Sequence, residues 1–115
     1  MKHMDGKLAQ NVVSRATKYW HLTSDQNAKA IVRQGLIKPG ARGNVHAYIA
    51  NSLPLDEAID DVVVWFRGRG LNPRNIAVVE FTTDQPREGG TGGAKWKGPV
   101  SIDGKIIKTV PFKLV

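Results

Sequence analysis

The chain has 115 residues, of which 41% are hydrophobic, and it contains no cysteine. This length suits a single domain with one core, the hydrophobic fraction excludes an intrinsically disordered chain, and the absent thiols exclude disulfides and thiolate metal sites. Lys and Arg number 17 against 10 Asp and Glu, so the formal net charge is +7, which serves solubility or attracts polyanions and acidic proteins.

The first residues lack the apolar stretch of a signal peptide, and no apolar run approaches the roughly 20 residues that span a bilayer. We expect a tag remnant, or the edge of a longer protein, at residues 1–6. Apolar residues then recur at a loose helical spacing: Leu8, Val12, Val13 and Ala16. We therefore divide the chain into an N-terminal helical or tag-derived segment, residues 1–18, and a domain over residues 19–115.

A short apolar and aromatic strand is predicted over residues 19–22, and it runs into the clearest helix of the chain. Residues 23–26 match a capping box, with Thr23 as the cap and Gln26 as the N3 residue. Gly35 supplies the C-terminal stop. The apolar face of this helix is at helical spacing: Ala28, Ile31, Val32 and Leu36. A loop rich in turn residues follows, and residues 45–50 are predicted to form a second strand.

A further helix is expected next, capped by Asn51 or Ser52 with Pro54 in its first turn. Residues 62–66 are rich in strand-forming residues, so the C-terminal half of this helix is open between helix and strand. Trp20 and Trp65 are expected in the core. The buried helix face would comprise five apolar residues: Ala58, Ile59, Val62, Val63 and Phe66.

The remaining elements are predicted to be strands and loops. Residues 75–83 indicate a strand with an apolar centre that Glu80 interrupts. The Gly-rich residues 86–99 predict a flexible loop. Asp103-Gly104 between two apolar runs is the strongest short hairpin signal, and Val110, Phe112 and Leu114 alternate as a final strand. The expected fold class is α+β, with helices early and antiparallel strands late.

One histidine and two hydroxyls lie together at the first strand-to-helix junction, in residues 19–24. The first N–H groups of a helix are unpaired and its dipole is positive there, which suits an anionic ligand such as a nucleotide. Tyr48 on the next strand is placed to stack on a flat group. His21 and Tyr48 are therefore the main candidates for a functional site.

Three segments together resemble the ADP-ribosyltransferase fold: Tyr-Trp-His-Leu-Thr-Ser, the helix with its Gly-Leu-Ile-Lys-Pro exit, and Val-His-Ala-Tyr-Ile-Ala-Asn-Ser. The resemblance covers residues 19–52 and is to the His-Tyr-acid, or diphtheria-toxin-like, branch. This branch includes C-terminal effector domains of bacterial polymorphic and contact-dependent toxins, and the RNA 2′-phosphotransferases share its opening motif.

The resemblance implies a small ADP-ribosyltransferase-like toxin domain that uses NAD as a substrate and holds no metal. It further implies delivery as part of a larger bacterial toxin, action in the target-cell cytoplasm, and an acidic immunity-type protein partner. His21 would hold an NAD ribose hydroxyl, Thr23 would lie near the bound nucleotide, and Tyr48 would stack on the nicotinamide.

The third residue of the motif is an acid, which stabilises positive charge on the ribose. Glu80 is assigned this role because it is the acid within a convincing strand, whereas a turn explains Asp103. The pyrophosphate of NAD needs cations or N–H donors, which Arg33, Arg67 or Arg69 would supply; of these, Arg67 and Arg69 are assigned to it.

Two other functions remain open from the residues. In a metal-independent ribonuclease toxin, His21 or His46 would act as general base, with Lys95, Lys97 or Arg69 stabilising the phosphorane. A non-catalytic module that binds nucleic acid or protein is the other. Nicotinamide release would support the transferase, RNA cleavage without NAD would support the ribonuclease, and neither activity would support the binding module.

Overall fold

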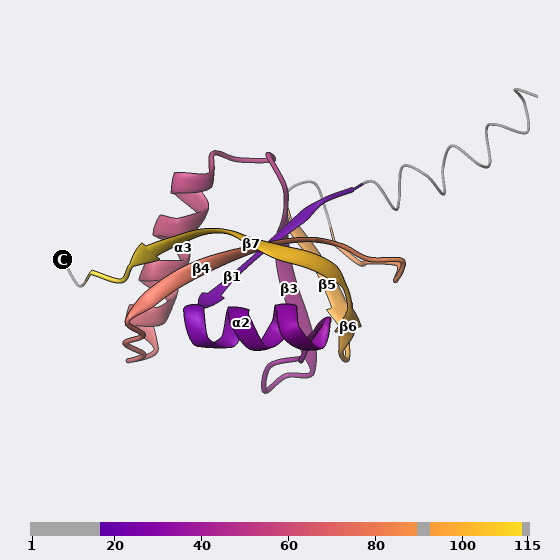
Figure 1. Cartoon of the computed structure of the whole chain (residues 1–115), viewed down its shortest axis with the longest axis horizontal. Helices are drawn as coiled ribbons and strands as arrows, with labels where there is room; N and C mark the ends of the chain where they lie inside the picture. Colours follow the sequence, from indigo (N-terminus) through magenta and orange to yellow (C-terminus); the bar gives the residue numbers. More distant parts are fainter. Residues whose placement is uncertain (1–16, 90–92, 114–115) are drawn as a thin grey trace, which may run out of the picture.

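The computed structural model describes residues 17–89 and 93–113 (Figure 1). In chain order its elements are β1 (Tyr19–Ser24), α2 (Asp25–Gln34), β2 (Leu36–Ile37), β3 (Asn44–Ile49), α3 (Leu55–Gly68), β4 (Asn75–Thr82), β5 (Gly93–Lys97), β6 (Val100–Ser101) and β7 (Asp103–Pro111). The predicted α+β class is confirmed. The predicted helical segment at residues 1–18 lies almost wholly outside the described residues. Within the described ranges no helix has the length and apolarity to cross a membrane.

Five strands form one antiparallel sheet in the order β5-β3-β1-β4-β7, and β2 and β6 form a separate two-stranded sheet. The central strand, β1, pairs with β4 over its full length. On its other side it pairs with β3 at only two positions, Tyr19 with Ile49 and Trp20 with Tyr48. The sheet is therefore continuous on one side of β1 and only partly joined on the other.

The two helices cover opposite faces of the sheet (Figure 1). Consecutive strand residues point to opposite faces, so Tyr19 packs in the cluster that contains α2, and Trp20 packs in the cluster that contains α3. Burial of Ala28 and Ile31 anchors α2, and burial of Ala58, Ile59 and Phe66 anchors α3 as predicted. Each face of the sheet thus has its own apolar core.

Helix α2 begins one residue later than the capping-box prediction. The cap is Ser24, whose Oγ accepts a hydrogen bond from the backbone N–H of Asn27 at 3.2 Å. Thr23 Oγ1 accepts instead from the Asn27 side-chain amide at 2.9 Å. Gly35 ends the helix as predicted, with φ of 66° and its N–H donating to the Ile31 carbonyl at 2.8 Å. That left-handed conformation favours glycine.

Helix α3 continues to Gly68, so the strand-forming residues 62–66 are helical. The prediction that Asn51 or Ser52 caps this helix is wrong. The cap is Pro54, which makes no side-chain capping bond. The Ser52 hydroxyl donates to the Ile49 carbonyl at 2.6 Å, so it closes the turn after β3. Packing of the buried face against the sheet outweighs the local propensity of residues 62–66.

Two predictions for the C-terminal third are wrong. The predicted loop over residues 86–99 contains β5, whose Ala94 and Trp96 are buried. The predicted hairpin at Asp103-Gly104 is part of one long strand, β7. A Cβ on Gly104 would lie 2.8 Å from the Phe81 Cβ and 2.9 Å from the Glu80 carbonyl oxygen. Close approach of β4, and not a turn, therefore requires glycine at this position.

Candidate functional site

His21 lies where the pairing between β1 and β3 ends. The Ala50 N–H donates to the Lys18 carbonyl at 2.9 Å, and hydrogen-bonded pairs alternate along an antiparallel ladder. By that alternation Leu22 and His46 would be a hydrogen-bonded pair, but the paired residues stop before them. Instead, the His46 carbonyl oxygen accepts a hydrogen bond from Nδ1 of the His21 ring, and the two atoms are 2.8 Å apart. The imidazole thus lies at the point where the two strands diverge.

This hydrogen bond determines the state of the His21 ring. A carbonyl oxygen only accepts, so Nδ1 carries the hydrogen and Nε2 of the neutral ring has a free lone pair. Burial lowers the pKa of His21 below its ordinary 6.5, the bond to the His46 carbonyl opposes this, and the nearby His46 ring lowers the pKa further. None of the described residues forms a hydrogen bond with Nε2. A half-buried, neutral acceptor results.

The start of α2 is already occupied by the chain's own groups. The Asp25 carboxylate accepts from the Gln26 N–H at 2.9 Å and from the Asn75 side-chain amide at 3.1 Å. These bonds, that from Asn75 above all, lower the pKa of Asp25. Thr23, predicted to lie near a bound nucleotide, is buried and its hydroxyl is bonded to Asn27. An anion would therefore meet a carboxylate at this helix start.

Tyr48 and His21 point to opposite faces of the sheet. Tyr48 lies opposite Trp20 in the ladder, and directly paired residues share a face. Its hydroxyl is hydrogen-bonded to Asp61 of α3; burial, then the charge of Asp61, then this bond raise the pKa of Tyr48. The structure therefore brings Tyr48 together with α3 and separates it from His21, although the two residues are on neighbouring strands.

Glu80 shares the face of Tyr48 and not that of His21. It lies opposite Trp20 in β4, and its Oε2 accepts from the Trp20 indole N–H at 3.1 Å. Its Oε1 lies 3.9 Å from Nζ of Lys18, and its side chain is 19% exposed. The carboxylate is thus held by Trp20 of β1 and by Lys18, the residue that precedes β1.

The two predicted phosphate-binding arginines lie at the end of α3. Arg67 is in its last turn, and Arg69 is the residue that caps it. The Arg69 guanidinium lies 4.3 Å from the centroid of the Trp65 ring. The core prediction is confirmed for Trp20, which is 4% exposed, and wrong for Trp65, which is 49% exposed.

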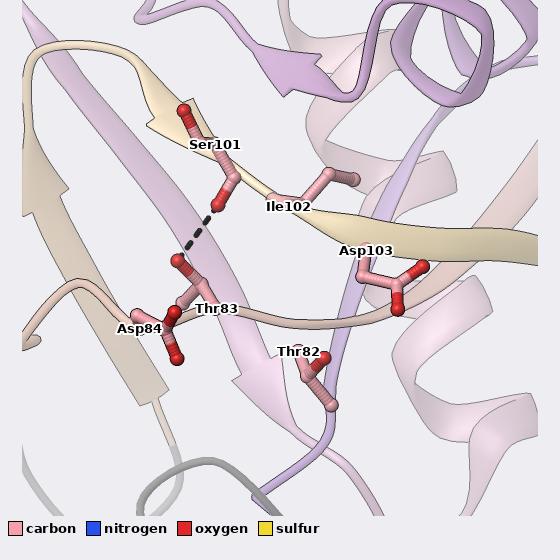
Figure 2. Close-up of a pocket in the computed structure, with 6 residues that line it drawn as sticks. All are labelled: Thr82, Thr83, Asp84, Ser101, Ile102 and Asp103. Carbon is pink, nitrogen blue, oxygen red and sulfur yellow. Dashed lines mark hydrogen bonds between the residues drawn. The ribbon is translucent and has the colours of Figure 1, made fainter.

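An open pocket of about 380 Å³ lies between the end of β4 and the β6–β7 segment (Figure 2). Thr83 Oγ1 donates to the Ser101 carbonyl at 2.8 Å and joins the two walls. Figure 2 shows Asp84 and Asp103 at opposite ends of the set of residues that line the pocket. Asp103, the alternative acid, is thus in a pocket that none of the other predicted site residues lines.

The structure also groups residues that the sequence treated only as alternatives. His46 is exposed and lies opposite Lys95 of β5, and Lys97 follows on the same strand face. The period-two pattern of Ala94 and Trp96 against the two lysines was the available signal, but the glycines around it indicated a loop. No three His, Asp or Glu side chains in the described ranges are grouped to hold a metal.

Comparisons with protein-family models, curated proteins and solved structures gave no match.

Proposed function

We propose that the domain is an NAD-dependent ADP-ribosyltransferase in which His21 binds a ribose hydroxyl of NAD where β1 and β3 diverge. The orientation of the His21 ring carries this proposal. Its Nδ1 donates to a backbone carbonyl that the sheet holds in place, so Nε2 is left to accept from a hydroxyl. The resemblance of residues 19–52 to ADP-ribosyltransferases supports NAD over other nucleotides.

In this reaction the bond between the ribose C1′ and the nicotinamide nitrogen breaks, and the electron pair leaves with nicotinamide. Positive charge develops on the ribose until a nucleophile of the acceptor bonds to C1′ and loses its proton. A protonated imidazole beside that ribose would oppose the charge. The lowered pKa of His21 keeps the ring neutral, so it orients the ribose without that penalty.

In this proposal Glu80 supports Trp20 and does not contact the ribose. Its carboxylate lies on the sheet face opposite His21 and accepts the indole hydrogen bond. The site therefore rests on His21 and the surrounding ends of β1 and β3.

Release of nicotinamide from NAD is the direct test. We expect the wild-type domain to release nicotinamide and His21→Ala to lose that release while keeping its far-ultraviolet circular dichroism. A folded wild-type domain that neither binds nor consumes millimolar NAD contradicts the proposal, as does full activity in His21→Ala.

The grouping of His46, Lys95 and Lys97 on one strand face favours a second candidate, metal-independent RNA cleavage. His46 would take the proton of a 2′-hydroxyl, whose oxygen bonds to phosphorus while the bond to the 5′-oxygen breaks and that oxygen takes up a proton from water. The lysines would stabilise the phosphorane. His46→Ala separates the candidates. The variant keeps the backbone carbonyl that orients His21, so NAD consumption should survive, whereas RNA cleavage without NAD would be lost.

A further inference from the structure

Trp65 is the exposed member of the chain's three tryptophans. Trp65 is 49% exposed, whereas Trp20 and Trp96 are 4% and 2% exposed. The Arg69 guanidinium stacks on the Trp65 ring at 4.3 Å. An exposed aromatic ring beside a cation can stack with a nucleobase while the cation contacts a phosphate.

Two contacts determine which way Trp65 faces. On one flank of α3, the Asp56 carboxylate lies 3.7 Å from the ammonium group of a β7 lysine. On the other flank, Asp61 is hydrogen-bonded to Tyr48 of β3. Residues four apart lie on the same side of a helix. Trp65 follows Asp61 by four residues, so it lies on the flank of α3 that faces β3.

The part of the sheet next to this flank is basic. The buried residues under α3 come from β1 and β4, whereas His46 and Lys97 on β3 and β5 are exposed. His46 lies opposite Lys95, and both share the face of Tyr48 because paired residues and residues two apart point the same way. Glu88 lies 3.7 Å from Nζ of Lys95.

The direction away from the Tyr48–Asp61 contact is the same along both elements. α3 follows β3 in the chain and runs in the direction opposite to β3 (Figure 1). His46 precedes Tyr48 by two residues on β3, which is about 7 Å, and Trp65 follows Asp61 by four residues on α3, which is about 6 Å. Because the two elements run in opposite directions, both steps lead the same way from the contact. Trp65 and His46 therefore lie on the same side of the Tyr48–Asp61 contact, towards the same end of the sheet.

We propose that this surface, formed by Trp65, Arg69, His46, Lys95 and Lys97, binds single-stranded nucleic acid. A base stacks on Trp65, and the neighbouring phosphates contact the lysines of β5. Unpaired bases are required because the bases of a duplex already stack on one another. The inference goes beyond the proposed reaction, since it concerns a macromolecule on the sheet face opposite His21.

The net charge of +7 supports an anionic ligand, and the aromatic ring supports nucleic acid over an acidic protein. Four acids lie in the first half of α3: Asp56, Glu57, Asp60 and Asp61. They repel phosphate, so a bound strand should run along Trp65 and β5 and avoid the start of α3. Charge alone would also attract acidic polypeptides, and the experiment separates these ligands.

The test uses fluorescein-labelled oligouridylate and oligothymidylate of about 12 nucleotides, with polyglutamate as an acidic polymer that lacks bases. Anisotropy reports binding, and tryptophan fluorescence reports stacking on Trp65 because Trp20 and Trp96 are buried. We expect both oligonucleotides to bind and to quench fluorescence. Removing one stacked base costs roughly tenfold to a hundredfold in affinity, so Trp65→Ala should weaken binding by that factor and Trp65→Phe should restore most of it.

Lys97→Ala should weaken binding and lower the salt slope by about 1, as expected for one phosphate contact. Its matched control is Lys105→Ala, on the far edge strand β7, which should bind as the wild type does. His21→Ala should also bind normally, so loss of the proposed reaction and loss of this surface are distinguishable. Polyglutamate affinity equal to that of the oligonucleotides, unchanged binding in Trp65→Ala, or equal effects of the two lysine variants would each overturn the inference.

Discussion

Replacement of Glu80 by leucine is expected to destabilise the domain through Trp20. The Trp20 indole N–H donates to Glu80 Oε2 at 3.1 Å, and Trp20 is only 4% exposed. Leucine leaves that N–H without its acceptor, and an unmade hydrogen bond of a buried group costs about 1–3 kcal/mol. The contact with Lys18 adds little, because it is 3.9 Å long and the Lys18 side chain is 61% exposed.

For a domain of this size, that cost corresponds to a fall in Tm of roughly 5–20 °C in Glu80→Leu. Glu80→Gln keeps an oxygen that accepts from the indole, so its Tm should lie much closer to that of the wild type. Glu88→Leu is the matched control. Its partner Lys95 is 3.7 Å away and the Glu88 side chain is 53% exposed, so the expected loss is about 0–1 kcal/mol.

Scanning calorimetry measures the Tm of the wild type and of the three variants, and nicotinamide release is measured on each folded variant. Equal stability of Glu80→Leu and the wild type would refute the structural role of the carboxylate. A Glu80→Gln variant with normal Tm and no nicotinamide release would return Glu80 to the catalytic role that the sequence predicted.

In urea unfolding, Gly104→Ala should lower the free energy of unfolding by about 1–3 kcal/mol, because its Cβ would lie 2.8 Å from the Phe81 Cβ. Gly68→Ala is the control, since a Cβ there has nothing within 4 Å, and it should not lower the free energy of unfolding. Tyr48→Phe should lose about 0.5–1.5 kcal/mol with the bond to Asp61. The pKa of His21 is depressed in the fold, so the unfolded chain binds more protons; the free energy of unfolding should fall as pH drops below about 6.5, and less so in His21→Ala. A Gly104→Ala domain as stable as the wild type, no loss in Tyr48→Phe, or equal pH dependence with and without His21 would contradict these expectations.

The elements with strong local signals were predicted well from the sequence. β1 and α2 have an apolar run, a hydroxyl cap and a terminal glycine in one stretch of chain. The strand runs two residues further than predicted, the cap is Ser24 and not Thr23, and Leu36, predicted on the apolar helix face, lies in β2. The missed elements depend on distant contacts. β5 lies among glycines, and the burial of Trp96 against Tyr19 and Phe81 is invisible to local pattern. At Gly104 the same dipeptide that signals a turn serves the approach of β4.

The sequence proposes residues for the candidate site but does not predict how they are arranged. The sequence singled out His21 as a candidate because a polar group within an apolar strand is conspicuous, and Tyr48 because it lies on the next strand. Which face each residue occupies depends on the register of β1 against β3, and a shift by one residue would reverse it. The sequence contains no local signal for that register, so the separation of His21 from Tyr48 and Glu80 required the structure.

The proposed reaction depends on a neutral His21 that presents Nε2 to NAD. Long-range proton–nitrogen correlation of the histidine rings, with and without NAD, tests it directly. At neutral pH we expect a His21 ring that carries a proton on Nδ1 and none on Nε2. Its Nε2 resonance should move when NAD is added and should be absent in His21→Ala. A His21 ring that is charged or protonated on Nε2, or one whose resonances are unchanged by millimolar NAD, would contradict it.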